Sequence, residues 1–152
     1  AANITDAVYL ATVGALCAPG AWSFRGPLTE LDDPTGIATQ AGNNFTLLPG
    51  KYVCTISGSV YGLGGSKLRL FDITNGVARG EIDTYAATSY QSTAVFTSSF
   101  EIIAATTFGV QTSCEQVPFP GDRFDWGIPV RDPVTNNYGP SDFVSIYCNR
   151  TN

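Results

Sequence analysis

Apolar and polar residues alternate with a period of two through the middle of this chain. Tyr52, Cys54 and Ile56 fall on one face of the stretch 51–57, and valine, threonine and serine fall on the other. Such alternation is typical of a half-buried β-strand. Pro49-Gly50 precedes this strand and the glycine-rich run 62–65 follows it. Both are turn signals, so they predict where the strand begins and ends.

A second strand follows, in which Leu68 and Leu70 alternate with charged residues. Asn75-Gly76 then predicts a tight hairpin turn, because both residues tolerate positive φ. Similar patterns predict further strands over 21–26, 81–85, 91–100 with a continuation over 101–105 after a bend, 107–114, 124–128 and 143–148. No stretch after residue 20 keeps a helical period. The chain is therefore predicted to be all-β, an antiparallel sandwich or barrel.

The first 20 residues differ from the rest. They are partly apolar but interrupted by Gly14 and Pro19-Gly20, so either a short helix or an extended segment fits them. We expect residues 1–20 to form an N-terminal arm or anchor. Residues 21–152 are expected to form one β-sandwich domain, since a chain of 152 residues can bury a sizeable core.

Charge and hydropathy exclude some classes of partner. The net charge is −5, and the eight lysine and arginine residues are scattered, so we do not expect nucleic-acid binding. No window of 18 apolar residues exists, so we expect no membrane insertion. The first residues lack a basic start, and a signal peptide is not expected there.

The order of motifs resembles the small jelly-roll domains of bacteriophage virion proteins, which are similar to the trimeric tumour-necrosis-factor-like fold. Leu48-Pro49-Gly50 with Tyr52 matches a turn that leads into a strand. Residues 69–76 match a second strand with its turn, and residues 102–111 match a third strand. The resemblance covers roughly residues 45–148. It implies a jelly-roll β-sandwich and a homotrimer.

The resemblance also implies a function. It favours a structural virion protein, most simply a capsid decoration or cement protein, whose partners are capsid or other virion proteins. Such a protein would be located in the virion and assembled in the host cytoplasm. The alternative is the receptor-binding, carbohydrate-binding tip of a tail fibre or spike, with a host-surface glycan as partner.

In trimeric relatives one inner sheet faces the threefold axis. The resemblance implies that this sheet contains the strands that begin near Ala21, Lys51, Thr107 and Phe143. Aromatic residues of these strands are then candidates for the trimer interface: Tyr52, Phe108, Phe143 and Tyr147. The alternative interpretation is that these residues are ordinary core residues of a monomer.

The residues that enzymes use most often are sparse. The chain has no histidine, which removes the usual general base and the commonest metal ligand. We therefore expect no enzyme, no catalytic residue, no cofactor and no metal. Two alternatives remain: Glu81 and Asp83 share a strand face and could cleave a glycoside, and Asp32-Asp33 could bind calcium rather than cap a turn before Pro34.

One loop combines charged and aromatic side chains in the sequence DRFDW. Aspartate, arginine and tryptophan often occur together in sugar-binding sites, so this loop is a candidate contact for a protein partner or a glycan. Its residues are Asp122, Arg123, Phe124, Asp125 and Trp126. The alternative is a solvated surface loop.

Four cysteines lie at positions 17, 54, 114 and 148, too far apart in sequence for a CxxC site. Two disulfides with three connectivities are open. The apolar neighbours of Cys54 and Cys114 favour free thiols that fill the core, as does assembly in a reducing cytosol. Three Asn-X-Ser/Thr sequons, at Asn3, Asn44 and Asn149, leave a secreted eukaryotic protein as a further alternative.

Overall fold

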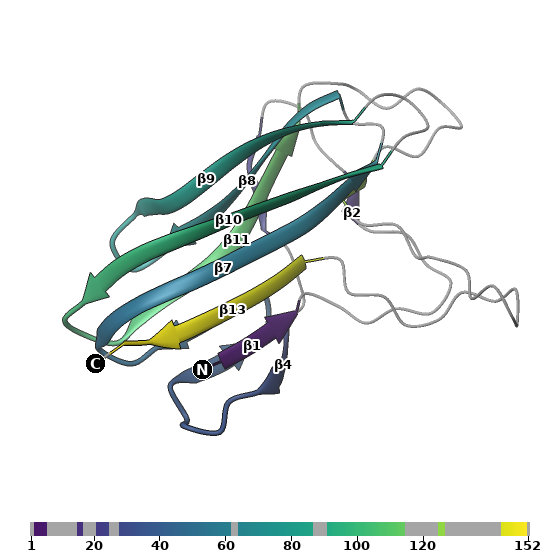
Figure 1. Cartoon of the computed structure of the whole chain (residues 1–152). Helices are drawn as coiled ribbons and strands as arrows, with labels where there is room; N and C mark the ends of the chain where they lie inside the picture. The colour runs from purple at the N-terminus through teal and green to yellow at the C-terminus, as the bar shows by residue number, and fades with distance from the viewer. Residues whose placement is uncertain are drawn as a thin grey trace, which may run out of the picture.

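The computed structural model describes residues 2–5, 15–16, 21–24, 28–61, 64–86, 91–114, 125–126 and 144–151. Within these ranges the chain forms two antiparallel sheets that pack face to face, and it contains no helix (Figure 1). The predicted all-β antiparallel sandwich is confirmed.

We call the two layers sheet 1 and sheet 2. Sheet 1 has the order β10 (Gln91–Ile102), β7 (Gly50–Tyr61), β13 (Val144–Arg150), β1 (Ala2–Thr5) and β4 (Thr29–Asp32). Two short strands extend it beside the end of β7, namely β12 (Asp125–Trp126) and β2 (Ala15–Leu16). Sheet 2 has the order β9 (Val77–Ala86), β8 (Gly64–Asp72), β11 (Thr106–Cys114), β6 (Asn44–Leu47) and β5 (Ala38–Ala41), and β3 (Ser23–Phe24) also pairs with β11.

The predicted alternation decides which side chains fill the space between the sheets. Tyr52, Cys54 and Ile56 of β7 have at most 1% of their surface exposed, and Leu68 and Leu70 of β8 have none exposed. Every second residue of a strand faces the same side, so each long strand gives one apolar row to the core. Burial of these rows is the main force that holds the layers together.

An aromatic row crosses the core from one sheet to the other. The ring centroids of Tyr52 and Phe100 in sheet 1 lie 5.9 Å apart. The Phe100 ring lies 5.1 Å from that of Phe108 in sheet 2. Phe108 in turn stacks on Phe45 at 5.6 Å. These separations are typical of favourable aromatic pairs, so the row fixes the two sheets relative to each other.

The described parts of the N-terminal segment are extended. β1 lies between β13 and β4, and Ala2 is opposite Cys148, so the two ends of the chain lie side by side (Figure 1). Residues 2–5 therefore belong to the sandwich, although they fall within the predicted arm. The boundary at residue 20 stays a prediction.

The predicted membership of the inner sheet is wrong for two strands. β7 and β13 lie in sheet 1 as expected, but β11 and β3 pair with each other in sheet 2. A period of two shows which residues share a face of one strand. It does not show which layer the strand joins, because that depends on pairing with distant strands.

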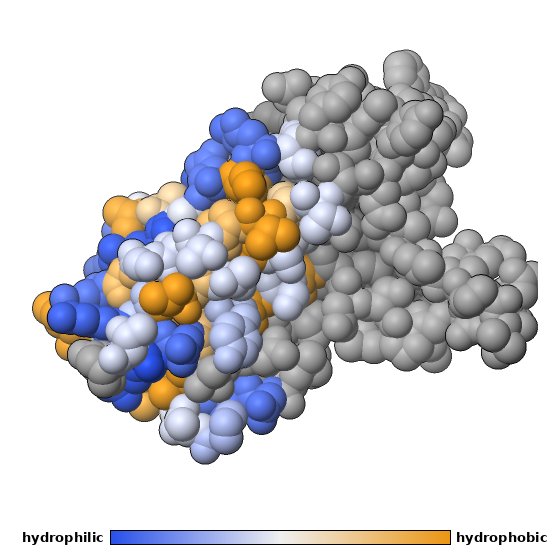
Figure 2. Space-filling model, viewed as in Figure 1, coloured by the Kyte–Doolittle hydropathy of each residue, from blue (hydrophilic) through white to orange (hydrophobic). Residues whose placement is uncertain are grey.

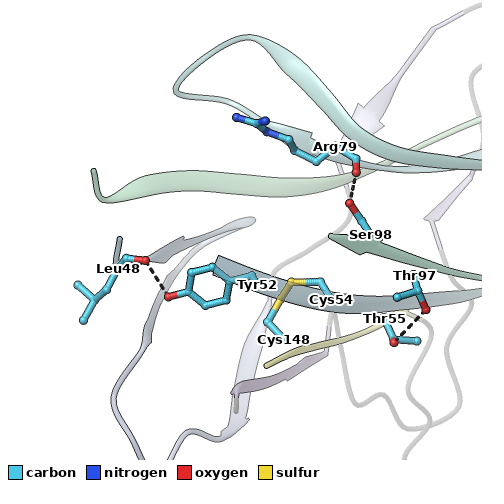
Figure 3. The surroundings of a disulfide bond; sticks show 8 residues. All are labelled: Leu48, Tyr52, Cys54, Thr55, Arg79, Thr97, Ser98 and Cys148. Carbon is cyan, nitrogen blue, oxygen red and sulfur yellow. Dashed lines mark hydrogen bonds between the residues drawn. A yellow bond between two sulfur atoms is a disulfide. The ribbon is translucent and has the colours of Figure 1, made fainter. Parts of the chain in front are cut away.

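The expectation of free thiols is wrong for Cys54 and Cys148, which form a disulfide (Figure 3). The two residues are directly opposite in the pairing of β7 with β13, and their Cα atoms lie 4.1 Å apart. Both side chains point into the core and have no exposed surface. The two cysteines are 94 residues apart in sequence, so the apolar residues next to each of them could not predict the pairing. Cys17 lies outside the described residues, and of Cys114 only the backbone in β11 is described.

Candidate functional site

The four candidate interface residues differ in their exposure to solvent. Tyr52 and Phe108 have 1% and 0% of their surface exposed, which fits the alternative interpretation that they are core residues. The Tyr52 hydroxyl donates a hydrogen bond of 2.7 Å to the carbonyl oxygen of Leu48 (Figure 3). Tyr147 is 49% exposed on β13. Phe143 lies outside the described residues.

Of the candidate contact loop 122–126, the structure describes Asp125 and Trp126. Their backbones form β12 and pair with Tyr61 and Val60 at the end of β7. Residues 122–124 lie outside the described ranges. A short strand was expected around this position, and the contact role of the loop stays a prediction.

Three of the carboxylates singled out from the sequence, those of Glu81, Asp83 and Asp33, have structural partners. The ammonium group of Lys67 lies 3.0 Å from the carboxylate of Glu81 and 2.9 Å from that of Asp83. The Asp33 carboxylate accepts a hydrogen bond of 2.8 Å from the backbone N–H of Ala38, as expected of a residue that caps a turn. Within the described ranges, no group of three or more potential ligands could hold a metal ion.

The solvent-facing side of sheet 1 is the best candidate for an interaction surface. Its residues alternate with the buried residues of β7, β10 and β13, and we call them the sheet 1 face. They are Lys51, Val53, Thr55, Ser57, Thr93, Val95, Thr97, Ser99, Glu101, Ser145, Tyr147 and Asn149. Half of them are serine or threonine.

The sheet 1 face has little charge and a scattered apolar surface. Its charged residues are Lys51 and Glu101, which lie opposite each other at one end of the strands. Val53, Val95 and Tyr147 are 37%, 50% and 49% exposed. Figure 2 looks onto this side of the molecule, where orange apolar groups stand among pale, weakly polar ones. The face is therefore broad and free of charge at its centre.

The outer side of sheet 2 is different, because charged residues lie along its edge strand β9 and the neighbouring strand β8. Lys67 and Arg69 of β8 are opposite Asp83 and Glu81 of β9. The cores of protein interfaces are depleted of charged residues, whereas solvated surfaces carry them. By this criterion the sheet 1 face, rather than sheet 2, fits contact with a further subunit.

A pocket of about 330 Å³ lies where the turn after β8 and the turn after β10 meet. Its cation, Arg79, is 2.8 Å from the fully buried carboxylate of Asp72. That carboxylate also accepts hydrogen bonds of 2.9 Å and 2.8 Å from the backbone and side chain of Asn75. Burial opposes ionisation of Asp72, but the hydrogen bonds from Asn75 and Arg79 outweigh it and lower the pKa of this carboxyl. These charges therefore hold the turn together and are not free for a ligand.

Sequence reasoning missed Val53 and Val95 as interface candidates. The signal was present, because Val53 alternates with buried residues and the stretch 91–100 is rich in serine and threonine. What the sequence could not show is that β10 and β13 flank β7, which brings the exposed sides of three strands into one face.

The chain matches no family model and no curated protein sequence. It is similar to solved structures over nearly its whole length. The globular domain of zebrafish complement 1qA protein gives a TM-score of 0.58 at 10% identity, covering 99% of this chain and 97% of that one. The crystal structure of murine APRIL at pH 5.0 gives a TM-score of 0.57 at 7% identity, covering 96% of this chain and 98% of that one.

A third similar structure is PRD1 vertex protein P5, with a TM-score of 0.51 at 12% identity, covering 99% of this chain and 97% of that one. The fold is a jelly-roll β-sandwich. The predicted jelly-roll fold is confirmed. At these identities the likeness shows the fold and nothing about function. No helix in the described part of the jelly roll is long and apolar enough to span a membrane.

Proposed function

We propose that this protein is a structural component of a virion that forms a homotrimer and decorates or reinforces a capsid, without turning over a substrate. The observation that carries the proposal is the charge-poor sheet 1 face on a jelly roll of this type. Two further points support it: the resemblance of residues 45–148 to phage virion domains, and the likeness of the fold to PRD1 vertex protein P5.

The chemistry of the sheet 1 face suits contact between identical subunits. Thr55 and Thr97 already form a hydroxyl pair at 3.3 Å across two strands. Hydroxyl groups donate and accept, so they can pair with copies of themselves across a symmetric interface. Val53, Val95 and Tyr147 would supply the apolar area. A trimer would also repeat each weak contact with the capsid three times, which strengthens binding through effective concentration.

A single charge in the sheet 1 face tests this interface. The variant Val95→Asp should dissociate the trimer, because a carboxylate buried between subunits must give up its water without gaining a partner. The matched control is Val77→Asp, the same substitution at a valine of sheet 2 with similar exposure, 43% against 50%. We expect the control to stay trimeric in size-exclusion chromatography with light scattering. Equal behaviour of the two variants would remove the proposed face from the interface.

We further propose that residues 1–20 anchor the trimer to its capsid. Deletion of the whole segment is a poor test, because it removes β1 from between β13 and β4. The double substitution Val8→Ser with Leu10→Ser lowers the apolar character of the segment and leaves the sequence of β1 unchanged. It should weaken capsid binding without changing the melting temperature.

The disulfide bears on where the protein matures. Disulfides persist in oxidising surroundings and are rare in a reducing cytosol. We propose that assembly takes place in the host cytoplasm with reduced thiols. After release, dissolved oxygen would take the two electrons and two protons of the Cys54 and Cys148 thiols as their disulfide forms. Protein taken from lysed cells under thiol-blocking conditions should then be reduced at both residues, and protein from purified virions should be oxidised.

Co-sedimentation with undecorated phage heads tests the function itself. The purified protein should pellet with the heads and saturate at a fixed number of copies per head. Tails from the same phage are the control and should leave it in solution. If the protein ignores heads but binds host-surface glycans, the decoration proposal is wrong and the receptor-binding alternative replaces it.

A further inference from the structure

A cation on the outer side of sheet 2 is held in a fixed position by neutral groups. The guanidinium of Arg69 lies 3.8 Å from the ring centroid of Trp22 and 4.7 Å from that of Phe71. Its Nε–H donates a hydrogen bond of 2.7 Å to the side-chain oxygen of Gln111, which is 6% exposed. Stacking and the hydrogen bond together restrict the planar group to one orientation.

An exposed aromatic ring completes this cluster. Phe24 is opposite Gln111 in the pairing of β3 with β11, and it is 40% exposed. A Cβ atom at Gly109 would lie 2.6 Å from the Phe24 ring, so glycine at this position lets the ring lie directly against β11. The result is an aromatic platform beside a fixed cation, which we call the Arg69 cluster (Trp22, Phe24, Arg69, Phe71 and Gln111).

The charge of Arg69 lacks a counter-ion among the described residues. Glu81 is opposite Arg69 on β9, but its carboxylate binds the ammonium of Lys67 at 3.0 Å. No described carboxylate lies within 4.0 Å of the guanidinium. Partial burial lowers the pKa of Arg69, against the opposing effect of Glu81. The two terminal nitrogens of the guanidinium also make no hydrogen bond to a described group, so within the described part of the chain both keep their donors for a ligand.

We propose that the Arg69 cluster binds the carboxylate of an acidic sugar. The fork of terminal nitrogens matches the two oxygens of a carboxylate. The exposed ring of Phe24 can pack against the apolar face of a pyranose. The chain carries a net charge of −5, so it would repel a partner protein with an extended acidic surface. A small ligand with one carboxylate would be repelled much less. This inference is independent of the trimer and of capsid binding.

Glucuronic acid and glucose form a matched pair of probes, because they differ only in the carboxylate at one carbon. Titration of the full isotope-labelled chain, followed by NMR, should show saturable shifts of the Arg69 and Gln111 amide signals with glucuronate. Glucose should bind at least about tenfold more weakly, since it lacks the charged acceptor. A short acidic peptide is the third probe and should cause no saturable shift.

Variants assign the binding to the guanidinium. Arg69→Gln should weaken glucuronate binding at least about tenfold, and Arg69→Lys, which keeps the charge but loses the fork, should also weaken it severalfold. The control Lys51→Gln removes a cation from the other sheet, where Lys51 lies opposite Glu101, and should leave affinity within about twofold. Melting curves confirm that each variant is folded. Equal binding of glucuronate and glucose, no effect of Arg69→Gln in a folded protein, or binding of the peptide alone would each overturn the proposal.

Discussion

Removing the disulfide between Cys54 and Cys148 should strongly destabilise the protein. The bond closes a loop of 94 residues. In the loop-closure model a cross-link of that span removes about 4–5 kcal/mol of chain entropy from the unfolded state, and native disulfides contribute about 2–5 kcal/mol. Both side chains are fully buried, so replacement by alanine also loses packing. We expect the variant Cys54→Ala with Cys148→Ala to lose about 3–5 kcal/mol of unfolding free energy.

Calorimetry without reductant measures this loss. For a chain of this size about 3–5 kcal/mol corresponds to a fall in melting temperature on the order of 10 °C. The control is Thr55→Ala, beside Cys54 on the same strand but on the sheet 1 face, and it should cost less than about 1 kcal/mol. The reasoning fails if the double variant melts within about 2 °C of the parent. It also fails if alkylation of unreduced, denatured protein labels both cysteines.

Two further substitutions test the core and its turn. Asp72→Asn should cost about 2–3 kcal/mol at neutral pH, because it leaves the charge of Arg79 without its partner. Folding lowers the pKa of Asp72, so this carboxylate stabilises the fold above its unfolded pKa, and the stabilisation is lost as pH falls through its folded pKa. The free energy of unfolding should therefore fall less on acidification in the variant than in the parent. Gly80→Ala places a Cβ atom 2.7 Å from the Phe96 ring and should cost about 1–3 kcal/mol in urea unfolding, whereas an unchanged midpoint would show that the ring moves aside freely.

Local patterns predicted the strands and much of the core, since a period of two is a property of a few adjacent residues. They placed Tyr52 and Val53 on opposite faces of one strand, and the structure buries Tyr52 and exposes Val53. They could not place Phe108 and Tyr147, because the side that faces a core depends on the sheet that a strand joins. The disulfide and the neighbours of β1 depend on the same long-range pairing.

The candidate sites also combine features that local sequence predicts with features that depend on long-range strand pairing. The serine- and threonine-rich stretch 91–100 indicates a polar strand face, but the charge-poor surface exists because β10 and β13 pair on either side of β7. Arg69 looks like an ordinary exposed residue of an alternating strand. Its aromatic neighbour Trp22 comes from a distant segment, so the Arg69 cluster is visible only in the folded chain.

The mass of the purified protein in solution tests the central claim, a homotrimeric jelly roll, most directly. Light scattering at micromolar concentration should give three times the chain mass of 16.1 kDa, unchanged on moderate dilution. A stable species of 16.1 kDa at that concentration would contradict the account. The sheet 1 face would then be an ordinary solvated surface, and the structural role proposed for the trimer would have no basis.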